Sequence, residues 1–214
     1  KLRLRGERST NPIAVGDYVL IQKQDEEKTG SITERLERRN SMVRKSVNLS
    51  KETHVVAANL DRAFLIATVV QPATSTGFMD RFLVTAHAYQ VPVTIVFNKV
   101  DVCAEGTPER AQLEYLEAVY ELAGIPTLRT SATTGEGLDS LTQELAASGV
   151  NLLSGHSGVG KSTLINALLP GTDLRTGEVS DAHQKGKHTT TLQKCFRCLQ
   201  EDLSLILQGS KASA

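Results

Sequence analysis

The sequence has little of what marks several broad classes of protein. It contains no tryptophan, aromatic residues make up 4% of it, and 24 Lys and Arg balance 24 Asp and Glu. A net charge of zero provides no overall basic field to attract nucleic acid. Three cysteines in 214 residues do not make a disulfide framework, which favours a reducing, cytoplasmic compartment. No apolar run could span a bilayer, no signal-peptide pattern opens the chain and nothing requires a dimer, so we expect a monomer that does not enter membranes.

What the sequence does contain is a phosphate-binding loop. Residues 155–162 read GHSGVGKS and fit the pattern G-x-x-x-x-G-K-[ST]. The apolar run at 150–153 predicts a buried strand before the loop, and residues 163–169 predict a helix after it. Glycines let backbone N–H groups face phosphate oxygens, and the helix N-terminus adds partial positive charge. The loop residues predicted to bind nucleotide are Gly155, His156, Ser157, Gly158, Val159, Gly160, Lys161, Ser162 and Thr163.

Four of the residues around this loop and downstream of it have predicted catalytic or metal-binding roles. Lys161 is expected to reach the β- and γ-phosphates, and the Ser162 hydroxyl to bind Mg²⁺. Residues 186–191 read GKHTTT and are the candidate for a switch segment in which a threonine completes the Mg²⁺ shell. Spacing does not decide which threonine does so, and we select Thr190. His188 is a candidate to orient the attacking water.

A second motif is typical of segments that recognise a guanine base. Asn98-Lys99-Val100-Asp101 follows the predicted buried strand at 93–97 and fits N-K-x-D. The Asp101 carboxylate can accept hydrogen bonds from the ring N–H and the exocyclic amine of guanine, a pair of donors that adenine lacks. This disfavours an ATPase or a kinase. Lys99 can lay its aliphatic stem along the base, and Asn98 can tether the neighbouring loops.

The order of the motifs is unusual. Residues 130–138 resemble the S-A-x-x-G-x-G loop of GTPases, in which the backbone after Ser131, at Ala132, would contact the guanine oxygen. Both guanine-reading segments precede the phosphate-binding loop, whereas in ordinary Ras-like GTPases they follow it. The domain therefore looks circularly permuted, which costs little because domain termini usually lie close together.

The fold class predicted from residue 60 onward is α/β. Continuous apolar runs predict strands at 63–70 and 93–97, and a shorter strand is predicted at 127–130. They alternate with helical patterns at 80–89, 107–123 and 138–147, which predicts a mostly parallel sheet.

Residues 1–50 instead show short strand candidates, such as 18–21 and 31–36, and turn signals, and resemble part of a small β-barrel. Five basic residues close this region, and they form either a solvated linker face or a surface for RNA phosphates: Arg35, Arg38, Arg39, Arg44 and Lys45.

Together these residues resemble the circularly permuted RsgA/YjeQ family of GTPases that depend on the small ribosomal subunit. Residues 8–17 look like the end of the family's OB-fold and 44–50 like its linker, and the motifs at 97–101, 155–162 and 186–191 follow in the family's order. The resemblance implies a GTP- and Mg²⁺-dependent hydrolase, with GDP as product. It would act in late maturation of the small subunit, be stimulated by that subunit, and contact ribosomal RNA through the OB-fold. It also implies a C-terminal zinc domain.

The resemblance divides the chain into three parts and is incomplete in the last. Residues 1–50 would be an incomplete OB-fold-like RNA-binding domain with its linker, 51–191 the GTPase domain, and 192–214 a remnant of the zinc-domain region. No D-x-P-G motif, which would contact Mg²⁺ and the γ-phosphate, follows residue 191, and Cys195 and Cys198 supply only two possible zinc ligands. The alternative is a guanine-nucleotide-dependent ribosome- or RNA-binding module with little or no hydrolysis.

Overall fold

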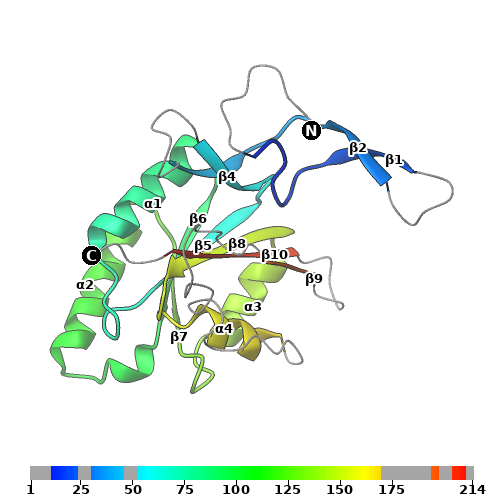
Figure 1. Ribbon diagram of the computed structural model, residues 1–214. Coiled ribbons are helices and arrows are strands. Elements are labelled where there is room, and N and C mark those ends of the chain that lie inside the picture. Colours follow the sequence, from blue (N-terminus) through cyan, green and yellow to red (C-terminus); the bar gives the residue numbers. More distant parts are fainter. Residues whose placement is uncertain (1–10, 24–29, 46–52, 170–193, 198–203, 211–214) are drawn as a thin grey trace, which may run out of the picture.

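A six-stranded sheet forms the centre of the computed structural model, which describes residues 11–23, 30–45, 53–169, 194–197 and 204–210 (Figure 1). Its strand order is β7-β6-β5-β8-β10-β9. Five strands run parallel and the edge strand β9 runs antiparallel to β10. The bounds are β5 Arg62–Ala67, β6 Val93–Asn98, β7 Thr127–Thr130, β8 Val150–His156, β9 Lys194–Arg197 and β10 Ser204–Ser210. The predicted α/β fold with a mostly parallel sheet is confirmed.

The sheet is buried on both faces, as its continuous apolar strands predict. On β5, Phe64 and Ile66 pack with α3 (Leu138–Ala146) and α4 (Lys161–Leu168). Leu65 and Ala67 point the other way and pack with α1 (Thr76–Ala88) and α2 (Pro108–Leu122). Figure 1 shows these two helix pairs on opposite sides of the sheet. All four β5 side chains are fully buried, so the alternation of side chains assigns one helix pair to each face.

The helix starts follow from capping side chains. Thr107 caps α2, with its hydroxyl accepting from the Arg110 amide at 3.3 Å, and Pro108 occupies the first turn as predicted. Helix α1 begins at Thr76, four residues before the predicted start at residue 80. The Ser75 hydroxyl accepts from the Phe78 amide at 3.3 Å and so stabilises a first turn that the apolar pattern did not reveal. Among the described residues, no helix is long and apolar enough to cross a bilayer.

The N-terminal region consists of two antiparallel strand pairs. β1 (Val19–Lys23) pairs with β2 (Gly30–Arg35), and β3 (Ser41–Lys45) pairs with β4 (Thr53–Ala58). The prediction of short strands is therefore confirmed. Their membership of an RNA-binding barrel and the domain boundaries at residues 50 and 191 stay predictions, although β9 and β10 continue the central sheet beyond residue 191.

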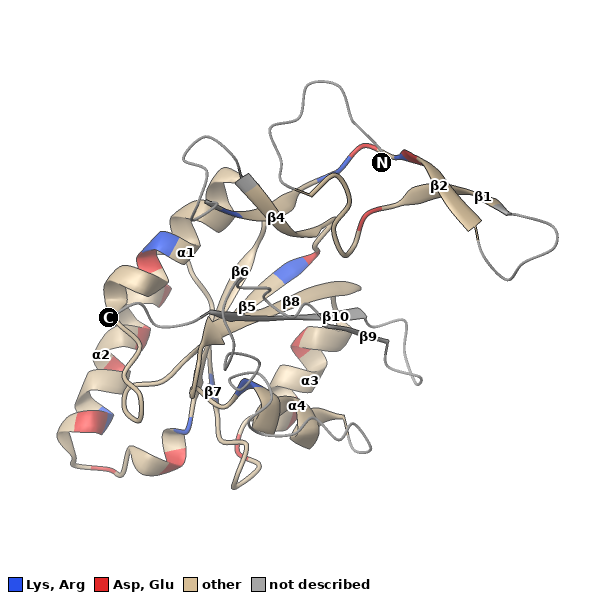
Figure 2. Cartoon of the chain, viewed as in Figure 1, with Lys and Arg blue, Asp and Glu red and all other residues tan. Residues whose placement is uncertain are grey.

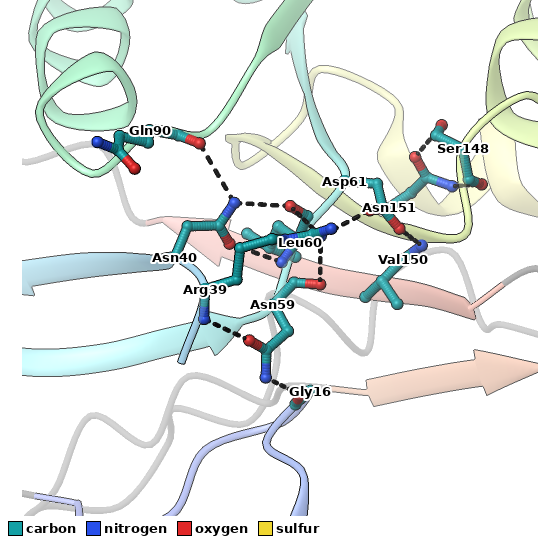
Figure 3. Close-up of polar contacts among 10 residues, drawn as sticks. All are labelled: Gly16, Arg39, Asn40, Asn59, Leu60, Asp61, Gln90, Ser148, Val150 and Asn151. Carbon is teal, nitrogen blue, oxygen red and sulfur yellow. Dashed lines mark hydrogen bonds and ion pairs between the residues drawn. The ribbon is translucent and has the colours of Figure 1, made fainter. Parts of the chain in front are cut away.

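Polar contacts join these strands to the amino end of the central sheet (Figure 3). The Asn40 carboxamide accepts from the Leu60 amide at 2.8 Å and donates to the Leu60 carbonyl at 2.8 Å. Asp61 accepts from the Arg39 guanidinium at 2.6 Å and from the Val150 amide at 2.7 Å. Burial opposes ionisation of Asp61, but the Val150 amide and Arg39 outweigh it and hold its pKa below the ordinary value.

An ion pair removes Arg38 from the surface that was predicted to contact RNA phosphates. Arg38 forms a two-bond ion pair with Asp17, at 2.6 and 2.7 Å, and its side chain is 11% exposed. The alternative of a solvated face is wrong for Arg38, because that side chain is buried in an ion pair. Arg39 is bound to Asp61, but its side chain is 60% exposed. Contact between Arg44 and RNA phosphates stays a prediction.

We expect Asp61→Ala to lower the free energy of unfolding by about 1–3 kcal/mol at pH 7, because the Val150 amide and Arg39 both lose an acceptor. The loss should be fully present above the pKa of Asp in the unfolded chain, and it should vanish as pH falls through the lower folded-state pKa. Urea unfolding across this pH range measures it, with the exposed Glu105→Ala as control. A change at pH 7 no larger than that of the control would contradict the prediction.

Candidate nucleotide-binding site

Three predicted binding segments lie at one edge of the sheet. Asn98, Thr130 and His156 are the last residues of the parallel strands β6, β7 and β8. The loops that follow parallel strands leave the sheet at the same edge, where ligands bind in folds of this kind. The N-K-x-D segment, the Ser131 loop and the phosphate-binding loop are therefore brought together, although 16 or more residues separate each segment from the next.

The buried carboxamide of Asn98 connects all three loops. Its Nδ2 donates to the Val159 carbonyl at 2.8 Å, and its Oδ1 accepts from the Thr130 hydroxyl at 3.1 Å. A carboxamide is suited to this position because it both donates and accepts. The Asn98 side chain thus fixes the base-reading segments relative to the phosphate-binding loop.

The phosphate-binding loop requires glycine for steric reasons. A Cβ on Gly155 would lie 2.4 Å from the Ile66 carbonyl oxygen. Gly160, at φ +89°, is the residue directly before α4, and a Cβ there would lie 2.5 Å from Nδ2 of Asn98. Close packing of the loop against β5 and Asn98 therefore excludes any larger residue at either position.

Lys161 is buried at the start of α4 and 7% exposed. Its ammonium donates to the carbonyls of Gly155, at 2.8 Å, and His156, at 2.5 Å. Burial lowers the pKa of Lys161 to about 8. Phosphate oxygens in the loop would favour the charged ammonium and raise that pKa again. Ser162, in the same first turn, is half-buried, which fits its predicted role as an Mg²⁺ ligand.

His156 packs against a helix on the other side of the loop. Its ring lies 3.7 Å from that of Phe78 in α1, centroid to centroid. Its Nδ1 is buried and has no hydrogen-bond partner among the described residues. Burial, and then the positive charges of Lys161 and Arg81, lower the pKa of His156, so its imidazole is neutral at pH 7.

The base-reading side is arranged by backbone contacts. Lys99 has a left-handed φ of 64°, and its ammonium donates to the Gln71 carbonyl at 2.6 Å. Asp101 is exposed in the short 3-10 helix η1 (Val100–Val102). The backbone amide of the buried Ser131 donates to the Glu136 carbonyl at 2.9 Å. Ala132, next in this loop, is half-buried.

Sequence reasoning missed the segment that follows β5. Pro72, Phe78 and Arg81 approach the phosphate-binding loop: Pro72 would contact a Cβ on Gly158 at 3.1 Å, Phe78 packs on His156, and the charge of Arg81 reaches His156. Strand β5 ends at the same edge of the sheet as β6 and β8. Any loop that leaves this edge is a candidate to line the site, so the predicted parallel strand could have indicated the segment after β5.

Several predicted site residues cannot be placed. His188, Thr190 and Cys198 lie outside the described residues, and Cys195 is a backbone position in β9 opposite Ile206. The described part of the chain holds no group of three or more possible metal ligands. The zinc site and the second Mg²⁺ ligand stay predictions.

The permuted order of loops at this edge defines a class, the circularly permuted P-loop GTPases. A YloQ crystal structure described as a circularly permuted GTPase matches 80% of this chain and 55% of that chain, with TM-score 0.53 and 28% identity. Within this class, the chain belongs to the RsgA GTPase family, whose sequence model matches residues 35–206. The family resemblance drawn from the motifs is confirmed.

Relatives and a further structure agree. The small ribosomal subunit biogenesis GTPase RsgA of Bacteroides fragilis is 53% identical over 91% of this chain, and that of Porphyromonas gingivalis is 51% identical over 90%. The crystal structure of YjeQ from Thermotoga maritima matches 92% of this chain and 61% of that chain, with TM-score 0.68 and 32% identity. The chain spans 61% of the length of these curated relatives.

Burial of Lys161 predicts pH-dependent nucleotide binding. We expect GTP affinity to be highest below pH 8 and to fall as pH rises above it, by up to about tenfold per pH unit, because the free protein then loses the Lys161 proton that the complex retains. Titration with a fluorescent GTP analogue at pH 7, 8 and 9 measures the slope, and calorimetry in two buffers should detect proton uptake near pH 8. Constant affinity over this range, with no proton uptake, would refute the role of Lys161.

Proposed function

We propose that this protein binds and hydrolyses GTP as a factor in late maturation of the small ribosomal subunit, which stimulates it and whose ribosomal RNA it contacts. The observation that supports the proposal is the Asn98 carboxamide, which joins the two loops predicted to recognise guanine to the phosphate-binding loop. The relatives named as small ribosomal subunit biogenesis GTPases supply the biological setting.

In this proposal, the described residues would bind the nucleotide and stabilise its charge. Amides of the phosphate-binding loop and the N-terminus of α4 would face the phosphates. Lys161, which now donates to two backbone carbonyls, would donate to phosphate oxygens instead. Ser162, with Thr190 as the predicted second ligand, would hold Mg²⁺, which would neutralise phosphate charge. His156 lies in the same loop, and its neutral imidazole adds no charge of its own.

The exposed carboxylate of Asp101 gives a test of base choice. We expect Asp101→Asn to weaken GTP binding on the order of 100-fold, because an amide cannot accept from both guanine donors. The same change should improve binding of XTP, whose base carries a carbonyl that the new amide can donate to. Competition between GTP, XTP and ATP measures this, with the nearby exposed Glu105→Gln as matched control. An unchanged preference for GTP would remove Asp101 from the site.

One observation favours a second candidate, a nucleotide-gated binding module with little hydrolysis. β8, which leads into the phosphate-binding loop, is flanked by β5 and β10. Gln208, Gly209 and Ser210 of β10 align with Ser154, Gly155 and His156. A motif that reaches both Mg²⁺ and the γ-phosphate needs such a strand end beside the loop, and here it reads Gln-Gly-Ser instead of beginning with the Asp of D-x-P-G.

GTP turnover with Mg²⁺, measured with and without purified small ribosomal subunits, separates the two candidates. Strong stimulation by the subunits is expected if the protein is a ribosome-activated GTPase. Binding of GTP with no turnover in either condition would favour the binding module. Failure of the protein to bind GTP at all would contradict both candidates.

A further inference from the structure

An open groove lies beside α2, between this helix, β7 and α3. Its volume is about 570 Å³. Helix α2 contributes Glu114, Glu117, Ala118 and Glu121, strand β7 contributes Arg129, and the Ser131 loop contributes Glu136. None of these side chains is used in nucleotide binding as described above.

An apolar ridge borders the groove. Tyr115, Val119 and Leu122 are 63%, 42% and 92% exposed. Their spacing of four and then three residues places them on one face of α2. Ala118, which lines the groove, is three residues from Tyr115 and four from Leu122, so ridge and groove are adjacent. A helix face with three exposed large apolar side chains beside a groove is typical of an interaction surface.

The side chains that line the groove carry an excess of negative charge, which favours a partner of positive charge. Four carboxylates line it against one guanidinium, that of Arg129, which is already bound to both oxygens of Glu117. Glu114 is paired with Arg110 at 2.7 Å. Glu121 and Glu136 have no salt-bridge partner among the described residues, although the charge of Arg129 reaches Glu136. The Glu121 carboxylate accepts from the Thr127 hydroxyl at 2.6 Å. Figure 2 shows acidic positions along α2.

From this arrangement we propose that the groove and ridge bind a basic segment of a partner protein. Its Arg or Lys side chains would enter the groove toward Glu121 and Glu136, and its apolar side chains would cover Tyr115, Val119 and Leu122. The negative charge of the groove disfavours an RNA backbone here, because phosphates would be repelled by the carboxylates. A protein segment that is both basic and amphipathic matches the two properties at once.

The surface is connected to the guanine-reading loop. Glu136 lines the groove with its side chain, while its carbonyl accepts from the Ser131 amide at 2.9 Å. A partner bound at the groove would therefore contact the segment that positions Ala132. The proposal itself does not require GTP hydrolysis, because the surface lies outside the nucleotide contacts.

The test uses a fluorescein-labelled peptide with Arg and Leu at helical spacing, and a second peptide with Glu in place of Arg. Fluorescence anisotropy at physiological salt should show binding of the basic peptide and not of the acidic one. Glu121→Lys should weaken binding at least about tenfold, because it replaces attraction with repulsion. Leu122→Ser should weaken it several-fold through loss of apolar contact.

Matched controls are available on other surfaces. Glu37→Lys reverses an exposed charge in the N-terminal region, and Val84→Ser removes an apolar side chain that is 70% exposed on α1. Both should leave peptide affinity unchanged, and all four variants should retain GDP binding as evidence of folding. Equal peptide affinity across Glu121→Lys, Leu122→Ser and the controls would overturn the proposal. The proposal would also be overturned if a labelled single-stranded RNA bound the protein and this binding were lost in Leu122→Ser.

Discussion

The buried Asn98 side chain is the interaction on which the nucleotide site depends. It is one of few polar groups within an apolar sheet, and burying it is favourable only because both ends of the carboxamide are hydrogen-bonded. That requirement holds the phosphate-binding loop and the Thr130–Ser131 segment at fixed distances. The base and the phosphates of one nucleotide would be bound by different loops. A site that binds both therefore needs these loops to be held at a fixed separation.

The charges of the site follow from the same packing. Gly155 and Gly160 allow the loop to lie directly on β5 and Asn98, and this closeness leaves Lys161 almost no contact with water. A buried ammonium without a counter-ion is costly, which explains its lowered pKa and its two carbonyl contacts. Phosphate oxygens in the loop would supply the missing counter-charge and so relieve that cost.

The two ends of the sheet have different roles. Nucleotide loops occupy the carboxyl end, while Arg39, Asn40 and Asp61 attach the N-terminal strands at the amino end (Figure 3). Asp61 holds the first amide of β8, and β8 ends in the phosphate-binding loop. The segment between β2 and β3 is therefore linked, through Asp61, to the strand that leads into the nucleotide site. Helix α2 offers a separate, acidic and apolar surface on one flank of the sheet.

Sequence alone determined the features that depend on neighbours along the chain. The phosphate-binding loop, N-K-x-D, the buried strands and the Thr107 cap of α2 are local patterns of glycine, charge and apolar periodicity, and the structure contains each of them. Tertiary structure decided what depends on distant partners. The ion pair of Arg38 with Asp17, the contacts of Pro72 and Phe78 with the phosphate-binding loop, and the place of β10 beside β8 could not be read from the chain. An ion pair or a strand pairing is set by which segments packing brings within a few ångströms, and linear spacing does not contain that information.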